Sequence, residues 1–167
     1  KERCVIQNSN PEDLRHPVQL GGTNSAVIDS SFYNIRQTVV RSENHCILVG
    51  QSTGPILVQN CYLEGYFGIL IGGFSWTGTQ QDVTIRQNHF FRLASWGNDS
   101  LQKHCVEGKS GVRVLVEQNV FDPNGTFSIG EVRFYFTEFD GSGSDSADWT
   151  IRYNKFRNNT NTISDAY

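Results

Sequence analysis

The sequence lacks several features that would place it in a common class of protein. Its 14 lysine and arginine residues and 17 aspartate and glutamate residues leave a net charge of -3. The basic residues are spread along the chain and form no cationic stripe for a phosphate backbone, so we expect no nucleic-acid partner. No apolar run approaches the roughly 18 residues that a membrane-spanning helix needs, so we also expect no membrane span.

Methionine is absent, even at position 1. The apolar pattern of a β-strand already begins with Cys4, Val5 and Ile6. We therefore expect residues 1–167 to be a single domain that is a processed product or a piece of a longer chain.

Cysteine is scarce, and no two cysteines have the C-x-x-C spacing that indicates zinc. The number is also too small for a disulfide-scaffolded mini-protein. The four cysteines are either buried free thiols or form one or two disulfides, and both alternatives stay open. They are Cys4, Cys46, Cys61 and Cys105.

Helical periodicity is missing as well. No segment longer than about ten residues has apolar residues at spacings of three and four, and glycine or asparagine interrupts every candidate. The sequence therefore predicts little or no helix.

What the sequence does contain is an internal repeat. Five segments share an apolar residue, two variable positions, Asn or Ser, one variable position and an aromatic residue, at 27–32, 57–62, 85–90, 116–121 and 151–156. An apolar run precedes each of them, at 18–22, 46–50, 68–73, 104–108 and 132–136. Because a unit of two or three short strands cannot cover its own apolar side, such units must stack on one another. The repeat predicts an all-β fold, a parallel β-helix of about six coils, rather than a β-sandwich, which has no reason to repeat a phrase.

Stacking would align like residues of successive coils into columns. We expect an amide ladder at the bend after the first strand of each unit, where an amide tolerates left-handed backbone geometry and bonds to its neighbours above and below. An aromatic ladder would lie beside it. The predicted ladders are Asn60, Asn88, Asn119 and Asn154, and Phe90, Phe121 and Phe156.

Three copies of the repeat are nearly the same phrase: VTIRQNHFFR at 83–92, VLVEQNVFDP at 114–123 and WTIRYNKFRN at 149–158. These phrases resemble the right-handed parallel β-helix proteins of the pectate-lyase-like superfamily, and the resemblance covers nearly the whole chain. It implies a right-handed solenoid and a secreted or cell-surface location. Members include polysaccharide lyases, hydrolases and epimerases as well as phage tailspikes and adhesins, so function has to be argued from individual sites.

Charged residues follow the inward apolar residue in three successive copies: Arg86, Glu117 and Arg152. In register they would form a ladder of opposite charges, which stabilises by a few tenths to about 1 kcal/mol per pair. The resemblance implies the alternative that an arginine is a base or charge stabiliser. The structural ladder is favoured, because no acid cluster accompanies these residues and no acid pair on matching strand positions suits glycoside hydrolysis.

Two kinds of loop residue are further candidates. Trp76 and Trp96 are candidate platforms for sugar rings, with buried loop anchors as the alternative. Asp140, Asp145 and Asp148 are candidate Ca²⁺ ligands, but their spacing is not that of an EF-hand and a flexible acidic loop is the favoured interpretation. We expect no other cofactor.

Two histidines, His45 and His104, each precede a cysteine. They belong to coils two apart, about 10 Å from each other, whereas metal ligands lie near 2 Å from the ion. We interpret them as structural residues at the strand edge.

Two functions stay open. The first is a non-catalytic β-helix module of a secreted or cell-surface protein, serving as structure or binding a polysaccharide. The alternative, which the resemblance alone supports, is a polysaccharide lyase or glycoside hydrolase, so whether the chain is an enzyme is undecided. Unpaired strand edges at both ends of the stack also predict end-to-end self-association.

Overall fold

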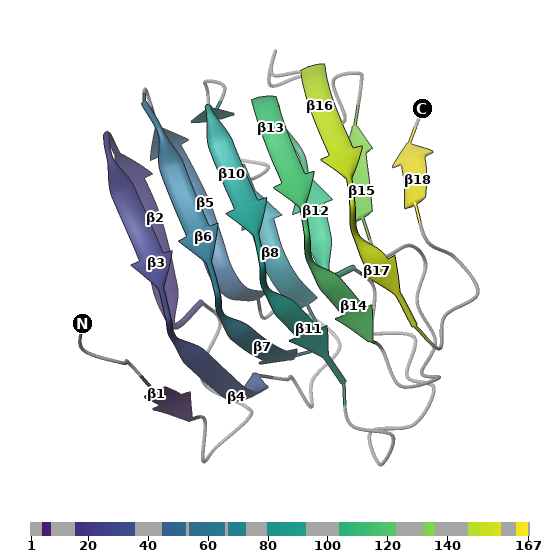
Figure 1. Ribbon diagram of the computed structural model, residues 1–167. Coiled ribbons are helices and arrows are strands. Elements are labelled where there is room, and N and C mark those ends of the chain that lie inside the picture. The colour runs from purple at the N-terminus through teal and green to yellow at the C-terminus, as the bar shows by residue number, and fades with distance from the viewer. Residues whose placement is uncertain are drawn as a thin grey trace.

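The computed structural model describes residues 5–7, 16–35, 45–52, 54–65, 67–72, 80–92, 104–122, 132–135, 147–157 and 163–166. Every regular element within these ranges is a β-strand, and none is a helix. Three parallel sheets, which we call A, B and C, contain the strands (Figure 1). The described part therefore holds no helix that could cross a membrane.

Each sheet takes one strand from each successive turn of the chain. Sheet A contains β1 (Val5–Gln7), β4 (Ser31–Ile35), β7 (Tyr62–Gly65), β11 (His89–Phe91), β14 (Val120–Asp122) and β17 (Lys155–Phe156). Sheet B contains β2 (Val18–Gly22), β5 (His45–Ser52), β8 (Phe67–Ile71), β12 (Val106–Gly108), β15 (Val132–Tyr135) and β18 (Ile163–Ala166). Sheet C contains β3 (Ser25–Ile28), β6 (Ile56–Gln59), β10 (Val83–Arg86), β13 (Gly111–Glu117) and β16 (Ala147–Arg152), with β9 (Gln80–Gln81) paired to β13.

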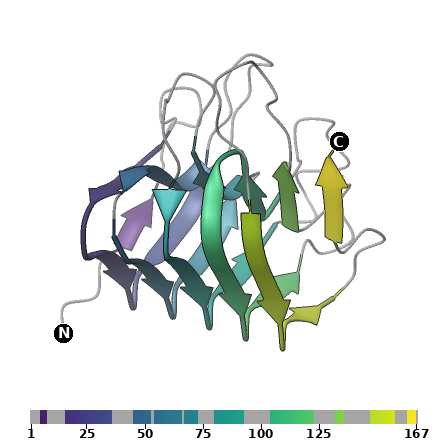
Figure 2. The ribbon, with the colours of Figure 1, turned by 90° about the horizontal axis from the view of Figure 1, so that it is seen from above.

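The chain passes through sheets B, C and A in turn, and each strand pairs in parallel with its counterpart one turn away (Figure 2). This is a β-solenoid, which confirms the all-β parallel fold expected from the repeat. The five apolar runs that precede the repeated phrases all contribute strands to sheet B. The repeated phrase itself bends at its centre, so it supplies one strand to sheet C and one to sheet A instead of a single strand.

The interior consists of columns of like residues, as predicted. In sheet C, Val58, Ile85 and Val116 are in register and fully buried. The aromatic ladder is confirmed: ring centroids are 4.9 Å apart for Phe90 and Phe121 and 5.0 Å apart for Phe121 and Phe156, with nearly parallel planes.

The second copy of the repeat is one residue out of the predicted register. The pairing aligns Val58, not Leu57, with Ile85, and Leu63, not Tyr62, with Phe90. Because strand side chains alternate between faces, this shift of one residue reverses which side chains point inward. Cys61 therefore occupies the amide position, and the prediction that Asn60 belongs to the amide ladder is wrong.

The bend between sheets C and A has one residue in the left-handed conformation in every described coil. These residues have φ between 53° and 58°, and they are Asp29, Asn60, Gln87, Gln118 and Tyr153. Asn88, Asn119 and Asn154 each directly follow one of these residues, so the ladder amides do not have the left-handed backbone that was predicted for them. Asn60 does have it, but Asn60 lies outside the ladder.

Three cysteines, Cys46, Cys61 and Cys105, are buried free thiols. Burial raises the pKa of the Cys46 and Cys61 thiols, so both stay protonated and unreactive. Cys4 lies outside the described residues.

Candidate functional site

The amide ladder is a structural element of the bend. Each amide bridges two neighbouring coils: Asn119 Nδ2 donates to the carbonyl of Ile85 at 2.9 Å and to Asn154 Oδ1 at 3.0 Å, and Asn119 Oδ1 accepts from the Asn88 backbone N at 3.0 Å. Asn88 repeats the arrangement one coil earlier, where its Oδ1 accepts from the Cys61 backbone N. Asn88 and Asn119 are both 1% exposed, and their amide groups bond within the stack.

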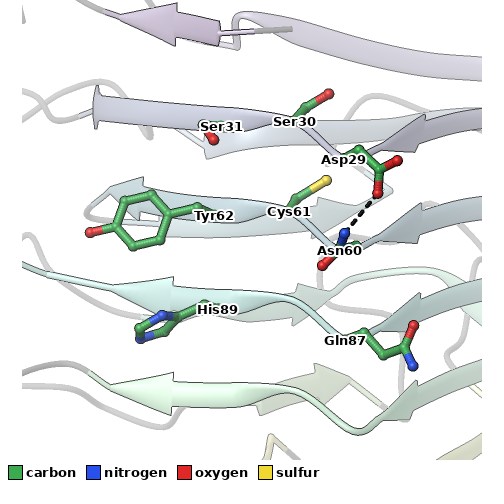
Figure 3. Close-up of a pocket in the computed structure, with 8 residues that line it drawn as sticks. All are labelled: Asp29, Ser30, Ser31, Asn60, Cys61, Tyr62, Gln87 and His89. Carbon is green, nitrogen blue, oxygen red and sulfur yellow. Dashed lines mark hydrogen bonds between the residues drawn. The ribbon is translucent and has the colours of Figure 1, made fainter. Parts of the chain in front are cut away.

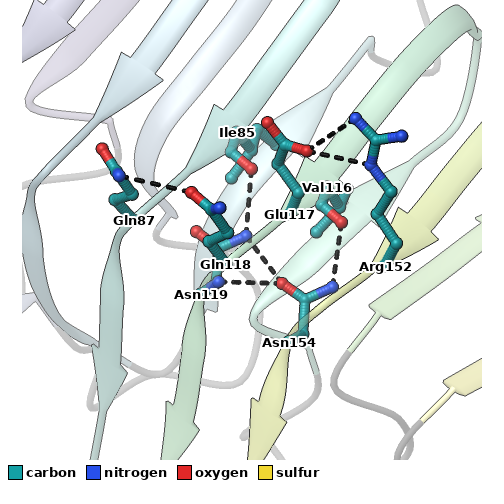
Figure 4. Close-up of polar contacts among 8 residues, drawn as sticks. All are labelled: Ile85, Gln87, Val116, Glu117, Gln118, Asn119, Arg152 and Asn154. Carbon is teal, nitrogen blue, oxygen red and sulfur yellow. Dashed lines mark hydrogen bonds and ion pairs between the residues drawn. The ribbon is translucent and has the colours of Figure 1, made fainter.

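The charged ladder on the outer face of sheet C is in register as predicted, with Arg86 beside Glu117 and Glu117 beside Arg152. Arg152 and Glu117 form an ion pair, with Nε and Nη2 both 2.9 Å from Oε2 (Figure 4). Arg86 instead donates to the Gln59 amide oxygen from Nε and Nη2. All three side chains thus have structural partners along the sheet.

The loop candidates are mostly beyond what the structure describes. Trp76, Trp96, Asp140 and Asp145 lie outside the described residues. Asp148 is an exposed residue of β16 with φ of 55°, and its charge helps to raise the pKa of Arg113. Among the described residues, no group of three or more histidine, cysteine, aspartate or glutamate side chains could hold a metal ion.

An aromatic surface that the sequence analysis did not single out lies on the outer face of sheet A. Its rings come from three successive coils: Tyr33 from β4, Tyr62 from β7, and His89 and Phe91 from β11. The Tyr62 ring centroid is 5.4 Å from that of Tyr33, 5.5 Å from that of His89 and 6.0 Å from that of Phe91. All four side chains are partly exposed. We call these four residues the aromatic strip.

The strip exists because of simple strand alternation. Phe32 and Phe90 point into the core, so their neighbours at positions 31, 33, 89 and 91 must point outward. The signal was present in the sequence as an aromatic residue or histidine directly before or after the inward position: Tyr33 follows Phe32, Tyr62 precedes Leu63, and His89 and Phe91 flank Phe90. It was missed because the register of the second copy, which contains Tyr62, was assigned one residue early.

A groove of about 640 Å³ runs beside the strip along the bend between sheets C and A. Polar left-handed residues line one side, and Ser31, Tyr62 and His89 line the other (Figure 3). The Asn60 amide nitrogen donates to an Asp29 carboxylate oxygen at 2.7 Å across neighbouring coils. The groove thus presents hydrogen-bonding groups next to aromatic rings.

Protonation states in the strip are set by its surroundings. Burial, together with the nearby Glu64 carboxylate, raises the pKa of Tyr62, and the Tyr62 hydroxyl donates to Glu64 Oε2 at 3.3 Å. Burial lowers the pKa of His89, against the opposing carboxylate of Asp122. At neutral pH the strip therefore carries a neutral phenol and a neutral imidazole.

A second unusual region is a group of ionisable side chains on the outer face of sheet B. Glu107 stands between Val106, which faces the core, and Gly108, so its side chain points outward. Its Oε2 is 3.6 Å from His45 Nε2, and its Oε1 is 3.8 Å from Lys109 Nζ. His104 is close enough to lower the pKa of Glu107. We call Glu107, Lys109, His45 and His104 the buried cluster, since none is more than 7% exposed.

The electrostatics of the buried cluster keep Glu107 ionised. Burial by itself would raise the pKa of Glu107, but the His45 imidazole, the positive charge of Lys109 and the His104 ring outweigh it and lower the pKa to about 2. The sequence did place His45 and His104 on equivalent strand positions, but it gave no reason to join them to Glu107. The usable signal was that Glu107 occupies the position of Leu48 and Leu70 in earlier coils.

Comparison with known proteins adds no relative: no protein-family model, curated protein or solved structure matches the chain. The assignment to the β-solenoid class therefore rests on the strand pairing described above.

Proposed function

We propose that the chain is a right-handed parallel β-helix of about six coils, related to the pectate-lyase-like proteins, and that it is a carbohydrate-binding module of a secreted or cell-surface protein. The resemblance of the repeated phrases supports the handedness, the relationship and the location. The aromatic strip carries the proposed binding function.

Sugar recognition needs apolar faces with a few well-placed polar groups, and the strip and its groove combine the two. The rings of Tyr33, Tyr62 and Phe91 offer apolar faces on successive coils, at ring separations of 5.4 to 6.0 Å. Asn60 and Gln87 offer amides on the other side of the groove. A flat scaffold with no ligand would not need partly exposed aromatic side chains in contact on one face.

Binding can be tested by isothermal titration of the purified chain with a panel of soluble polysaccharides. The double substitution Tyr33→Val and Tyr62→Val removes two rings and keeps strand-forming residues; valine already occupies the Tyr62 column at Val120. We expect affinity to fall by at least about tenfold, which corresponds to about 1.4 kcal/mol. Tyr153→Asn, which removes a 77% exposed tyrosine outside the strip, is the matched control and should bind normally. Unchanged affinity in the double variant would refute the proposal.

A second candidate function is a polysaccharide lyase or hydrolase, and the buried cluster is the observation that favours it. A buried carboxylate with a perturbed pKa and specific charge partners is a candidate functional group, and Glu107 would act there as a fixed negative charge. The two preceding coils have leucine in the position of Glu107, at Leu48 and Leu70, and the following coil has Arg133.

This second function predicts product formation from the same polysaccharides, read as reducing ends and as unsaturated products, with and without Ca²⁺. We expect Glu107→Gln and His45→Gln each to abolish turnover, whereas Arg113→Gln, on the outer face of sheet C, should retain it. Absence of turnover by the native chain across the panel would leave only the binding function.

A further inference from the structure

The groove along the bend between sheets C and A is lined by charge of one sign. Among the described residues that border it, Asp29 is the single carboxylate, and there is no lysine or arginine. His89 also borders the groove, but burial lowers its pKa, so its imidazole is neutral at neutral pH. The lining therefore carries a net negative charge.

The aromatic side of the groove lies in a negative potential as well. Burial raises the pKa of Tyr62 most, and the charges of Glu64 and Asp122 raise it further. Negative charges that oppose ionisation of a phenol also attract a cation to its ring. Arg157, at 4.0 Å from Asp122, offsets part of this charge, whereas Glu64 accepts hydrogen bonds from the Asn34 backbone N and the Tyr62 hydroxyl, which are neutral donors.

The carboxylate and the ring are close enough to contact one ligand. Asp29 comes two residues before Ser31, which pairs with Tyr62 in the next strand of sheet A. Two residues and one strand spacing put the Cα atoms of Asp29 and Tyr62 within about 8 Å of each other. Figure 3 shows the two side chains on opposite sides of the groove. Its volume of about 640 Å³ is within the range of about 300–1,000 Å³ that small-molecule sites have.

We infer that the groove binds an organic cation, with the ammonium group at the Asp29 carboxylate and the rest of the ligand against the Tyr62 ring. This site goes beyond the proposed carbohydrate-binding function, because it does not require a sugar on the aromatic strip. The ammonium group can belong to a small quaternary amine or to the amino groups of an aminosugar polymer, and the test distinguishes these two sources.

Two matched pairs of ligands test the role of the positive charge. Choline is compared with its uncharged analogue, in which carbon replaces the quaternary nitrogen. Chitosan oligosaccharides are compared with their N-acetylated counterparts, chitin oligosaccharides. NMR titration of the isotope-labelled chain gives the affinity and locates the site. We expect the charged member of at least one pair to bind about tenfold more tightly than the neutral member, with the largest shifts of backbone amide signals in residues 29–31 and 60–62.

Asp29→Asn removes the charge and preserves the local structure. The backbone of Asp29 is left-handed, with φ of 54°, which asparagine tolerates equally, and its amide oxygen can still accept the hydrogen bond from Asn60 Nδ2. We expect this variant to bind the charged and neutral ligands equally. Asp148→Asn makes the same change at another left-handed aspartate, with φ of 55°, in β16, and is the matched control that should keep the preference. Thermal unfolding verifies that both variants are folded.

The outcomes assign the source of the ammonium group or overturn the inference. Preference for choline over its analogue indicates a small quaternary amine, and preference for chitosan oligosaccharides alone indicates an aminosugar polymer. If neither charged ligand is preferred, or if Asp29→Asn leaves the preference intact, the groove is not an organic-cation site. The carbohydrate-binding function is judged separately, because it depends on the loss of polysaccharide affinity when Tyr33 and Tyr62 are replaced.

Discussion

Glu107 shows at the scale of one residue how a buried charge is accommodated in this fold. Leu48 and Leu70 occupy its position in two preceding strands of sheet B and are 6% and 5% exposed. Replacing such a leucine by a carboxylate costs desolvation energy that Lys109 and the two imidazoles only offset. A residue that is energetically less favourable at its position than the residue of the other coils marks a candidate functional site.

The first prediction concerns the pH dependence that Glu107 confers. Its pKa is lowered from 4.5 to about 2 in the folded chain, so its ionised form contributes stability that is complete above 4.5 and is lost as pH falls toward 2. We expect Glu107→Gln to unfold at a lower temperature than the native chain at pH 6, and the difference to shrink through that window. Melting curves by circular dichroism provide the measurement. A difference that stays constant from pH 6 to pH 2 would show that Glu107 is not held ionised.

Asn119 gives the second prediction at this scale. Its substitution by alanine leaves the carbonyl of Ile85 and the backbone N of Asn88 without their partners in a buried bend. Each unsatisfied buried group costs about 1–3 kcal/mol, so we expect a loss of about 3 kcal/mol in the free energy of unfolding. Urea titration measures it. Gln118→Asn, an exposed neighbour with left-handed backbone, should change stability by less than about 0.5 kcal/mol, and an equal loss in both variants would contradict the ladder's role.

At the scale of elements, the repeat predicted which segments become strands better than it predicted their register. The copies that contain Asn88, Asn119 and Asn154 aligned correctly, because an apolar residue, an amide and an aromatic residue agree in each. The second copy offers two registers: 57–62 matches the motif, whereas the structure uses 58–63, with Cys61 and Leu63 in the amide and aromatic positions. Pairing of the whole coil with its neighbours decides the register, and a motif of three positions does not include that information.

The sites were less predictable than the strands for the same reason. The aromatic strip and the buried cluster are made of residues from different coils, and they become neighbours only after the register is fixed. Tyr62 illustrates this: its assignment to the inward column hid its contact with Tyr33 and His89.

The corrected register makes a third prediction, about the element that follows β6. Cys61 Sγ already contacts the Val27 carbonyl at 3.7 Å, in the place where Asn88 Nδ2 donates to Val58 at 3.0 Å. Cys61→Asn should therefore extend the amide ladder by one coil and raise the free energy of unfolding by about 1 kcal/mol. Cys61→Ala, which removes the Sγ and adds no donor, is the control and should be less stable than the asparagine variant. The reverse order in urea titration would show that the ladder does not extend to this coil.

At the scale of the whole molecule, burial of the core decreases toward the first and last described coils of the stack. Core residues of the middle coils, such as Ile85 and Val116, are fully buried, whereas Ile151 and Phe156 in the last described strands of sheets C and A are only partly buried, as is Val27 in β3. Within the described residues, β16 and β3 each pair with a single strand of sheet C, so each has one edge without a described neighbour. Apolar side chains beside a free strand edge favour pairing with another strand.

End-to-end self-association is accordingly the last prediction: β16 of one copy would pair with β3 of the next. Sedimentation velocity should show species larger than a monomer whose proportion rises with concentration. Thr150→Lys places a charge on the exposed side of the edge strand β16 and should shift the distribution toward monomer, because edge lysines oppose strand addition. Thr84→Lys adds the same charge in the same column of the interior strand β10 and should leave association unchanged. A native chain that stays monomeric at every concentration would mean that the side chains at the two ends already suffice to prevent strand addition.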